Sequence, residues 1–262
     1  MPFTLAHPAA AIPLGRVLGR TSVLSALIIG SLSPDLIYFI PLGIKRAASH
    51  SLAGLFWFCM PVGLVGYVLF HSLLRPLGAY LLPLPLRARL PILPRSSWLP
   101  EAPLWAVLVS LVAGAATHLL WDAFTHRGGF VVAGAPALRT LLWEVGGYRV
   151  LTYKVLQHGS SLIGLSLLIF WGWQWFIATC PHHEPRGWQP PEAVRLPVLL
   201  VLLAAPVLGG IIAGVWHMGN ATSMKALQQF VGHGLITAIR VFGTIFLGFG
   251  VTWRLWEACG VP

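Results

Sequence analysis

The chain has 262 residues, of which 56% are apolar and only 9% are charged. A soluble domain carries about 25% charged residues, so this composition excludes an ordinary soluble fold and indicates a membrane protein. The net charge is +10, yet the chain has no Arg-rich arm or basic helix that could follow a phosphate backbone, which argues against nucleic acid as a partner. Most basic residues lie between apolar runs, where we expect contacts with anionic lipid headgroups.

Six apolar runs follow one another along the chain, and most reach the roughly 20 residues that a helix needs to cross a bilayer. They lie near residues 22–43, 52–74, 103–121, 159–180, 196–217 and 230–252. Backbone groups in lipid are satisfied only within helices or closed barrels, and the period-two alternation of a barrel is missing. We therefore predict an all-α, polytopic bundle of five or six membrane helices.

The first run favours a re-entrant or interfacial segment over a full crossing, because only about 12 apolar residues precede Ser33-Pro34-Asp35. Pro34 limits Ser33 to extended or turn conformations, so we expect a break at Asp35. Along the whole chain, proline-rich breaks suggest three parts: a helical membrane domain at 1–175 with the functional residues, a loop at 176–195 and a helix pair at 196–262.

The stretch ATHLLWDAFTHRGG places His118, Asp122 and His126 at four-residue intervals where the third run ends. On an α-helix these residues form one stripe. An ionisable group at membrane depth is costly unless it is paired, hydrated or bound to metal, so Asp122 is a candidate functional residue. The alternative is a helix that ends near Trp121, with Asp122 among hydrated headgroups.

Further His and Asp residues are expected at the same end of the bundle. Two crossings separate the connection that holds His50 from the one that holds His126 and His158, so both connections share a membrane face. Asp35 lies late in the first run, near that face, and His7 reaches the site if this run does not cross. A second group, Cys180, His182, His183 and Glu184, falls on the opposite face in a loop that we interpret as solvated.

Imidazoles and carboxylates with few thiols are the ligands of zinc, manganese or iron, and zinc is the first expectation. Such an ion lowers the pKa of bound water towards about 7 and polarises a phosphoryl or carbonyl oxygen, which is hydrolytic chemistry. We expect His126 to be a ligand or a proton carrier, Asp122 to bridge two ions if two are present, and Arg127 to stabilise an anionic substrate.

The segments MPFTLAHPAAAIPL, SPDLIYFIPL, SHSLAGL, THLLWDAFTHRGG and YKVLQHGSSLIGL cover about the first two thirds of the chain. They resemble an uncharacterised family of bacterial integral membrane proteins, the domain of unknown function 4184. The order His, Pro-Asp, Ser-His-Ser, His-x3-Asp also resembles the membrane-bound metal-dependent hydrolases and, more distantly, the zinc-dependent phospholipase C proteins.

The phospholipase pattern implies a set of metal ligands in this chain, namely His7, Asp35, His50, His118, Asp122, His126 and His158. Two departures reduce the number of ions that the resemblance implies. The chain begins with Met1-Pro2, where that pattern begins with a tryptophan whose amine binds metal, and Leu162 stands where the pattern has a Glu. One or two ions are therefore implied in place of three.

We thus expect a membrane-bound metal-dependent hydrolase in the bacterial cytoplasmic (inner) membrane, acting on an ester or phosphoester of a lipid or amphiphilic small molecule. Two alternatives stay open. The same His and Asp residues could form a transporter's proton or metal-ion pathway, or they could only bond helices together in a membrane scaffold. The sequence leaves the substrate, the metal, the membrane face and the oligomeric state undetermined.

Overall fold

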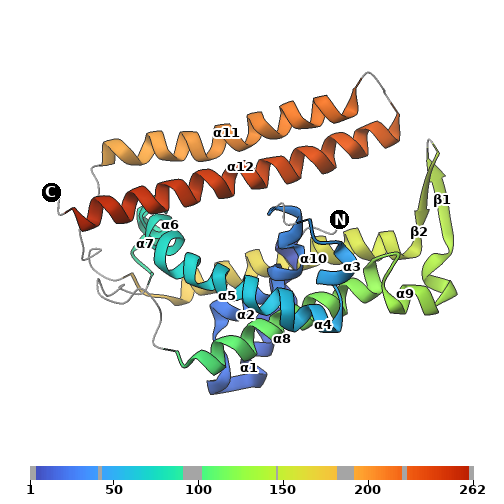
Figure 1. Cartoon of the computed structure of the whole chain (residues 1–262), viewed down its shortest axis with the longest axis horizontal. Coiled ribbons are helices and arrows are strands. Elements are labelled where there is room, and N and C mark those ends of the chain that lie inside the picture. Colours follow the sequence, from blue (N-terminus) through green and yellow to red (C-terminus); the bar gives the residue numbers. More distant parts are fainter. Residues whose placement is uncertain are drawn as a thin grey trace. The chain divides into compact units, whose positions relative to one another are not determined.

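The structure, a computed structural model, describes residues 4–40, 43–90, 102–145, 147–181, 192–219 and 223–259. These residues are almost entirely helical, which confirms the predicted all-α class (Figure 1). In chain order, the elements are η1 (Thr4–Ala6), α1 (Pro8–Leu18), η2 (Gly19–Thr21), α2 (Leu24–Leu32), η3 (Ser33–Tyr38), α3 (Arg46–Ser49), α4 (Leu52–Gly54), η4 (Leu55–Cys59), α5 (Met60–Leu69), η5 (Phe70–Leu74), α6 (Arg75–Leu81), α7 (Leu84–Arg87), α8 (Leu104–Thr125), α9 (Phe130–Gly134), η6 (Pro136–Arg139), β1 (Leu141–Val145), β2 (Tyr148–Leu151), α10 (Thr152–Ala178), α11 (Glu192–Met218) and α12 (Met224–Ala258).

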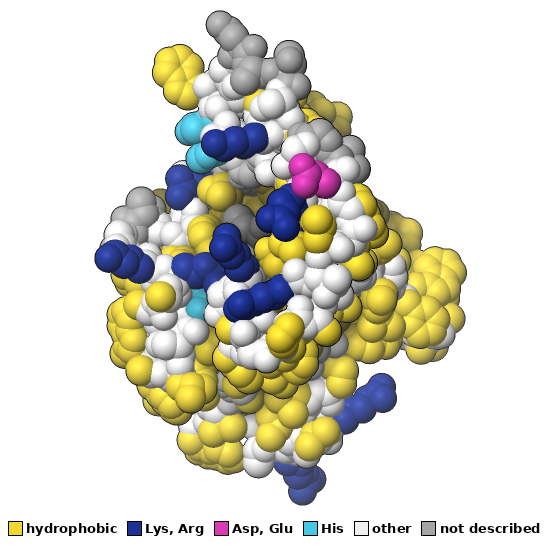
Figure 2. Space-filling view, turned by 90° about the vertical axis from the view of Figure 1, so that its right-hand side faces the viewer, with side chains coloured by type: hydrophobic (Ala, Val, Ile, Leu, Met, Phe, Trp, Pro, Cys, Tyr) yellow, Lys and Arg dark blue, Asp and Glu magenta, His cyan; other side chains and the backbone are white. Residues whose placement is uncertain are grey.

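Within the described residues, five helical stretches are long and apolar enough to cross a membrane. They are Leu52–Leu81, Leu104–Gly134, Thr152–Ala178, Ala193–Met218 and Met224–Trp256. Large hydrophobic side chains cover much of the face shown in Figure 2, where acidic side chains are few beside Lys and Arg. This surface is what lipid contact requires, because lipid tails solvate apolar side chains and water does not.

The first apolar run forms a shorter helix, Leu24–Tyr38, as its length predicts. The expected break at Asp35 is a change of helix type: α2 ends at Leu32, and the chain continues as the 3₁₀ helix η3. Ser33 keeps helical angles, with φ −61° and ψ −35°, so the expectation of an extended or turn conformation there was wrong. Pro34 is accommodated because it lies in the first turn of η3, where no backbone N–H is needed.

Contacts divide the chain into two compact units, and every residue of the candidate site belongs to the first. This unit comprises Met1–Tyr67, Ala102–Gly172 and Thr222–Lys225. In its core, α2 and α8 approach each other so closely that a Cβ on Gly114 would lie 2.1 Å from the carbonyl oxygen of Leu27, and one on Gly30 2.2 Å from that of Leu111. Small residues at such a contact let two helix backbones meet.

The second unit comprises Val68–Glu101, Trp173–Ala221 and Ala226–Pro262. Its core joins α6 to α11 through five buried side chains, those of Leu77, Tyr80, Leu81, Val198 and Leu202. Residues 68–90 therefore pack with the carboxy-terminal helices, although the division by proline-rich breaks grouped them with the amino-terminal part. Proline breaks mark where helices end, whereas packing depends on which apolar faces meet.

A β-hairpin precedes α10 and was not expected from the sequence. Strands β1 and β2 pair antiparallel, with Leu141 opposite Leu151 and Glu144 opposite Arg149. Gly147 follows β1 with φ +76°, a left-handed conformation that glycine adopts without strain and that tight hairpin turns require. The hairpin exposes Leu142 and Trp143.

Candidate metal centre

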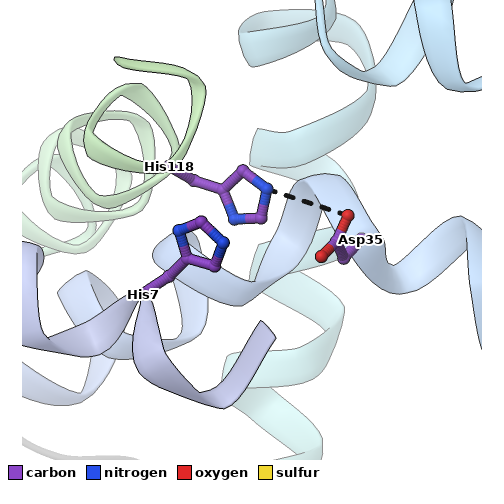
Figure 3. Close-up of side chains that lie close together, drawn as sticks. All are labelled: His7, Asp35 and His118. Carbon is purple, nitrogen blue, oxygen red and sulfur yellow. Dashed lines mark ion pairs between the residues drawn. The ribbon is translucent and has the colours of Figure 1, made fainter. Parts of the chain in front are cut away.

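Four segments of the first unit bring His and Asp side chains together. His118 and Asp122 lie one turn apart on α8, Asp35 lies on η3, and His50 follows α3 directly. His7 stands between η1 and α1, and its ring stacks on that of His118 with centroids 3.7 Å apart. In Figure 3, the His7 and His118 rings lie against each other, and His118 faces the Asp35 carboxylate.

The nitrogen and oxygen atoms of four of these residues have the spacing of a metal cage. Nε2 of His50 lies 3.2 Å from Oδ1 of Asp35 and 3.5 Å from Oδ2 of Asp122. Nε2 of His118 lies 3.7 Å and 3.5 Å from the same two oxygens. Zinc bonds of about 2.0–2.2 Å in a tetrahedron separate neighbouring ligand atoms by about 3.4 Å, so each of these four N–O separations matches a pair of neighbouring ligands on such an ion.

Two groups of three residues each place their ligand atoms within 4.8 Å of one another. One group is His7, Asp35 and His118, and the other is His50, His118 and Asp122. Both groups share His118. The described residues therefore form one continuous cage in which His118 is central.

Hydrogen bonds fix the rings so that Nε2 carries the lone pair. Nδ1 of His118 lies 2.7 Å from the carbonyl oxygen of Ser31, which can only accept, so Nδ1 carries the proton. Nδ1 of His50 lies 2.8 Å from the Ser49 hydroxyl. That hydroxyl donates to the carbonyl of Arg46 and therefore accepts from His50. Metal-binding histidines are typically held by such bonds at the second nitrogen.

The ring atoms that face the cage are buried without hydrogen bonds. Nδ1 and Nε2 of His7 and the Nε2 atoms of His50 and His118 have no hydrogen-bond partner among the residues that the structure describes. Each such buried polar atom costs about 1–3 kcal/mol. Four of them in one place are what a metal-binding site shows, because the ion supplies the missing partner.

The charge states suit a cation. Burial lowers the pKa of His7 to about 3, so its ring is neutral at pH 7, the form that binds metal. Without an ion, burial raises the pKa of Asp35, but the contact with a ring N–H of His50, the positive charge of a protonated His118 and the Thr4 hydroxyl more than offset this and bring its pKa to about 2; a bound cation would take the place of those ring protons. Thr4 donates to Oδ2 of Asp35 at 2.6 Å and leaves Oδ1 for the cage.

Asp122 also contacts two residues at the edge of the cage. Its Oδ1 lies 3.0 Å from Nδ1 of His126, the residue one turn further along. Its Oδ2 accepts a hydrogen bond from the guanidinium of Arg46, whose side chain is 35% exposed. His126 is bonded through Nδ1, which leaves its Nε2 for proton transfer.

Ion pairs and ring contacts thus join six of the seven predicted ligands. The ion pairs that connect the described residues of the cage do not include His158, which is exposed on α10. Arg127 is exposed beside His126, and the guanidinium that reaches the site is that of Arg46. His182, His183 and Glu184 of the second predicted group lie outside the described residues.

Sequence reasoning missed Arg46, Thr4 and the carbonyl of Ser31. Arg46 stands four residues before His50, so a helix between them would have placed both side chains on one face. Thr4 and Ser31 gave no signal, because a hydroxyl or a carbonyl near an apolar run is common. A buried His/Asp cage with a partly exposed arginine at its edge can hold a divalent ion and receive an anion.

The fold and this cage define a class: a helical protein with membrane-length apolar helices and a buried His/Asp cluster. Residues 1–249 match the family described as Domain of unknown function (DUF4184), and the chain belongs to that family. No curated protein and no solved structure matches the chain.

Proposed function

We propose that the protein is a membrane-bound metal-dependent hydrolase that cleaves an ester or phosphoester bond in a lipid or amphiphilic substrate. The observation that carries the proposal is the cage: two imidazole nitrogens, buried and without a hydrogen bond among the described residues, lie 3.2–3.7 Å from two carboxylate oxygens. The ligand set favours zinc, with one or two ions.

Asp35, His50, His118 and Asp122 would hold the ion, with His7 close enough to join them. A divalent ion there supplies a coordinated water with a pKa near about 7 and a Lewis acid for the substrate oxygen. His126 is oriented by Asp122 and is 16% exposed, so it can pass protons between the reacting atoms and water. Arg46 and, further out, Arg127 offer guanidinium groups to an anionic substrate.

The apolar surroundings favour an amphiphilic substrate. Leu120, Phe124 and Phe130 are 58%, 45% and 73% exposed, and they flank His126 in the sequence. Apolar side chains next to a polar cage place an ester at the site while the hydrocarbon part of the substrate remains in lipid. This arrangement, at the end of the membrane-length helix α8, supports a lipid-like molecule over a fully soluble one.

The test is turnover by protein purified in detergent, stripped with a chelator and reloaded with zinc. We expect release of nitrophenol from bis(p-nitrophenyl) phosphate, or cleavage of phospholipid or ester in mixed micelles, that disappears on stripping and returns on reloading. His126→Ala should lower turnover by about 10²–10⁴-fold with metal content retained. The matched control is His217→Ala, an exposed histidine on α11, which should keep full activity.

Turnover that survives stripping, or a His126→Ala variant as active as the control, would contradict the proposal. Metal-dependent accumulation of ions in proteoliposomes, with no bond cleaved in any of the three substrate classes, would replace hydrolysis with transport through the same residues.

A further inference from the structure

One carboxylate oxygen of the cage, Oδ2 of Asp122, is paired with the guanidinium of Arg46. Oδ2 of Asp122 faces Nε2 of His50 and Nε2 of His118 at 3.5 Å each, and it also accepts from Arg46. An ion bound by His50, His118 and Asp122 would need this same oxygen. Arg46 and a bound ion would therefore compete for Oδ2 of Asp122.

Charge counting shows what Arg46 does to the cage. With neutral imidazoles, Asp35 and Asp122 give the cage a charge of about −2, which a divalent ion would neutralise. Arg46 changes the sum to about −1, so the loaded site would carry about +1. A net positive site attracts an anionic substrate, but it holds its metal less tightly.

Ligand counting points the same way. If Asp122 bound the ion together with Asp35, His50 and His118, four protein ligands would fill a tetrahedral zinc, which is the arrangement of closed structural sites. Catalytic zinc sites keep three protein ligands and one exchangeable position. With Oδ2 of Asp122 held by Arg46, three of these four remain, namely Asp35, His50 and His118, and His7 would enter only through the group that it forms with Asp35 and His118.

The local backbone couples Arg46 to the ligand His50. Arg46 begins α3, and its carbonyl accepts hydrogen bonds from the backbone N–H of His50 at 2.9 Å and from the Ser49 hydroxyl at 3.2 Å. A single helical turn thus directs the guanidinium and the His50 ring at the same carboxylate. An exposed arginine in a solvated loop would have no such constraint.

We propose that Arg46 is a positioning residue that competes with the bound divalent ion for Oδ2 of Asp122 and so keeps one coordination position open for substrate. The inference rests on the proposed function, since it requires a bound ion. Substitution of a residue that only supports the structure would weaken metal binding, whereas substitution of Arg46 should tighten it.

The test measures zinc affinity by chelator competition on the full chain in detergent. Arg46→Gln should bind zinc at least about 10-fold more tightly than the wild type. Lys45→Gln removes the same charge from the neighbouring exposed residue and should change affinity less than about threefold. In an Asp122→Asn background, Arg46→Gln should have less than about a threefold effect, because the oxygen for which Arg46 competes is gone.

Arg46→Gln affinity equal to or weaker than that of the wild type would overturn the inference. Equal tightening in the Asp122→Asn background would also overturn it, because that result means general charge repulsion. If Arg46→Gln does not fold, Arg46→Lys keeps the charge without the planar fork and should still bind zinc more tightly than the wild type; unchanged affinity would count against the inference. A wild type without zinc affinity would instead refute the proposed function.

Discussion

At the scale of single residues, the cage depends on hydrogen bonds that turn each ligand atom inward. Ser31 holds His118, Ser49 holds His50, and Thr4 holds Asp35. Each bond leaves one nitrogen or oxygen facing the others. Metal affinity should therefore depend on residues that never touch the ion, as it does in known metal sites.

The Thr4 hydroxyl gives the cleanest test of this dependence. Thr4→Val keeps the side-chain shape but removes the donor to Oδ2 of Asp35. The carboxylate is then free to rotate, and we expect zinc affinity to fall by about 10–100-fold. Chelator competition measures the change.

Thr117→Val is the matched control, since the Thr117 hydroxyl donates to the carbonyl of Gly114 within α8. This variant should change zinc affinity by less than about threefold, because helix back-bonds of this kind add little stability. Equal losses in the two variants would show that Asp35 is not oriented through Thr4.

The sequence predicted residues whose positions follow from helix geometry. His118, Asp122 and His126 had to share a stripe because four-residue spacing repeats each turn of a helix. Arg46 was not singled out, because a basic residue between apolar runs is typical of a headgroup anchor, and its four-residue spacing from His50 indicates a shared face only if the two lie on one helix. His158 was expected to converge by membrane face, yet sharing a face does not fix which way a side chain points.

At the scale of elements, the close contact between α2 and α8 brings η3, which follows α2, to the end of α8. A Cβ on Gly114 would lie 2.1 Å from the Leu27 carbonyl oxygen, so Gly114→Ala must separate the helices. We expect a loss of about 1–3 kcal/mol in stability, seen as a lower melting temperature in detergent. Zinc affinity should fall with it, because Asp35 and His118 move apart.

Gly172→Ala is the control on α10, where a Cβ would meet nothing within 4 Å. Alanine favours helix over glycine by up to about 1 kcal/mol, so this variant should melt at the same temperature or slightly higher. Similar melting temperatures for the two variants would mean that the close α2–α8 contact does not support the fold.

The lengths of the apolar runs predicted the long helices, but the short elements between them were not predicted. The long helices lie within a few residues of the apolar runs because lipid imposes one length and one secondary structure. The hairpin β1–β2 was missed although its sequence, LLWEVGGYRVL, contains a Gly-Gly turn between β-favouring residues.

At the scale of the whole molecule, the chain divides into two units. The residues of the candidate site belong to the first unit, whereas α11 and most of α12 belong to the second. All six connected site residues lie in the first unit, and so do all five segments that resemble the family. Composition alone predicted the membrane character, because 9% charge cannot cover a soluble surface. Which of the long helices pack together could not be predicted, since all five long helical stretches in the described part of the chain are apolar.

The central claim, that this cage holds a divalent ion, is tested most directly by counting metal. Elemental analysis of the detergent-purified chain, supplied with zinc and then freed of loose ions by gel filtration, should give one or two ions per chain. His118→Ala, which removes the ligand that both groups share, should lose the ion, and His217→Ala should retain it. A wild type without stoichiometric metal, or a His118→Ala variant with as much metal as the wild type, would contradict the account.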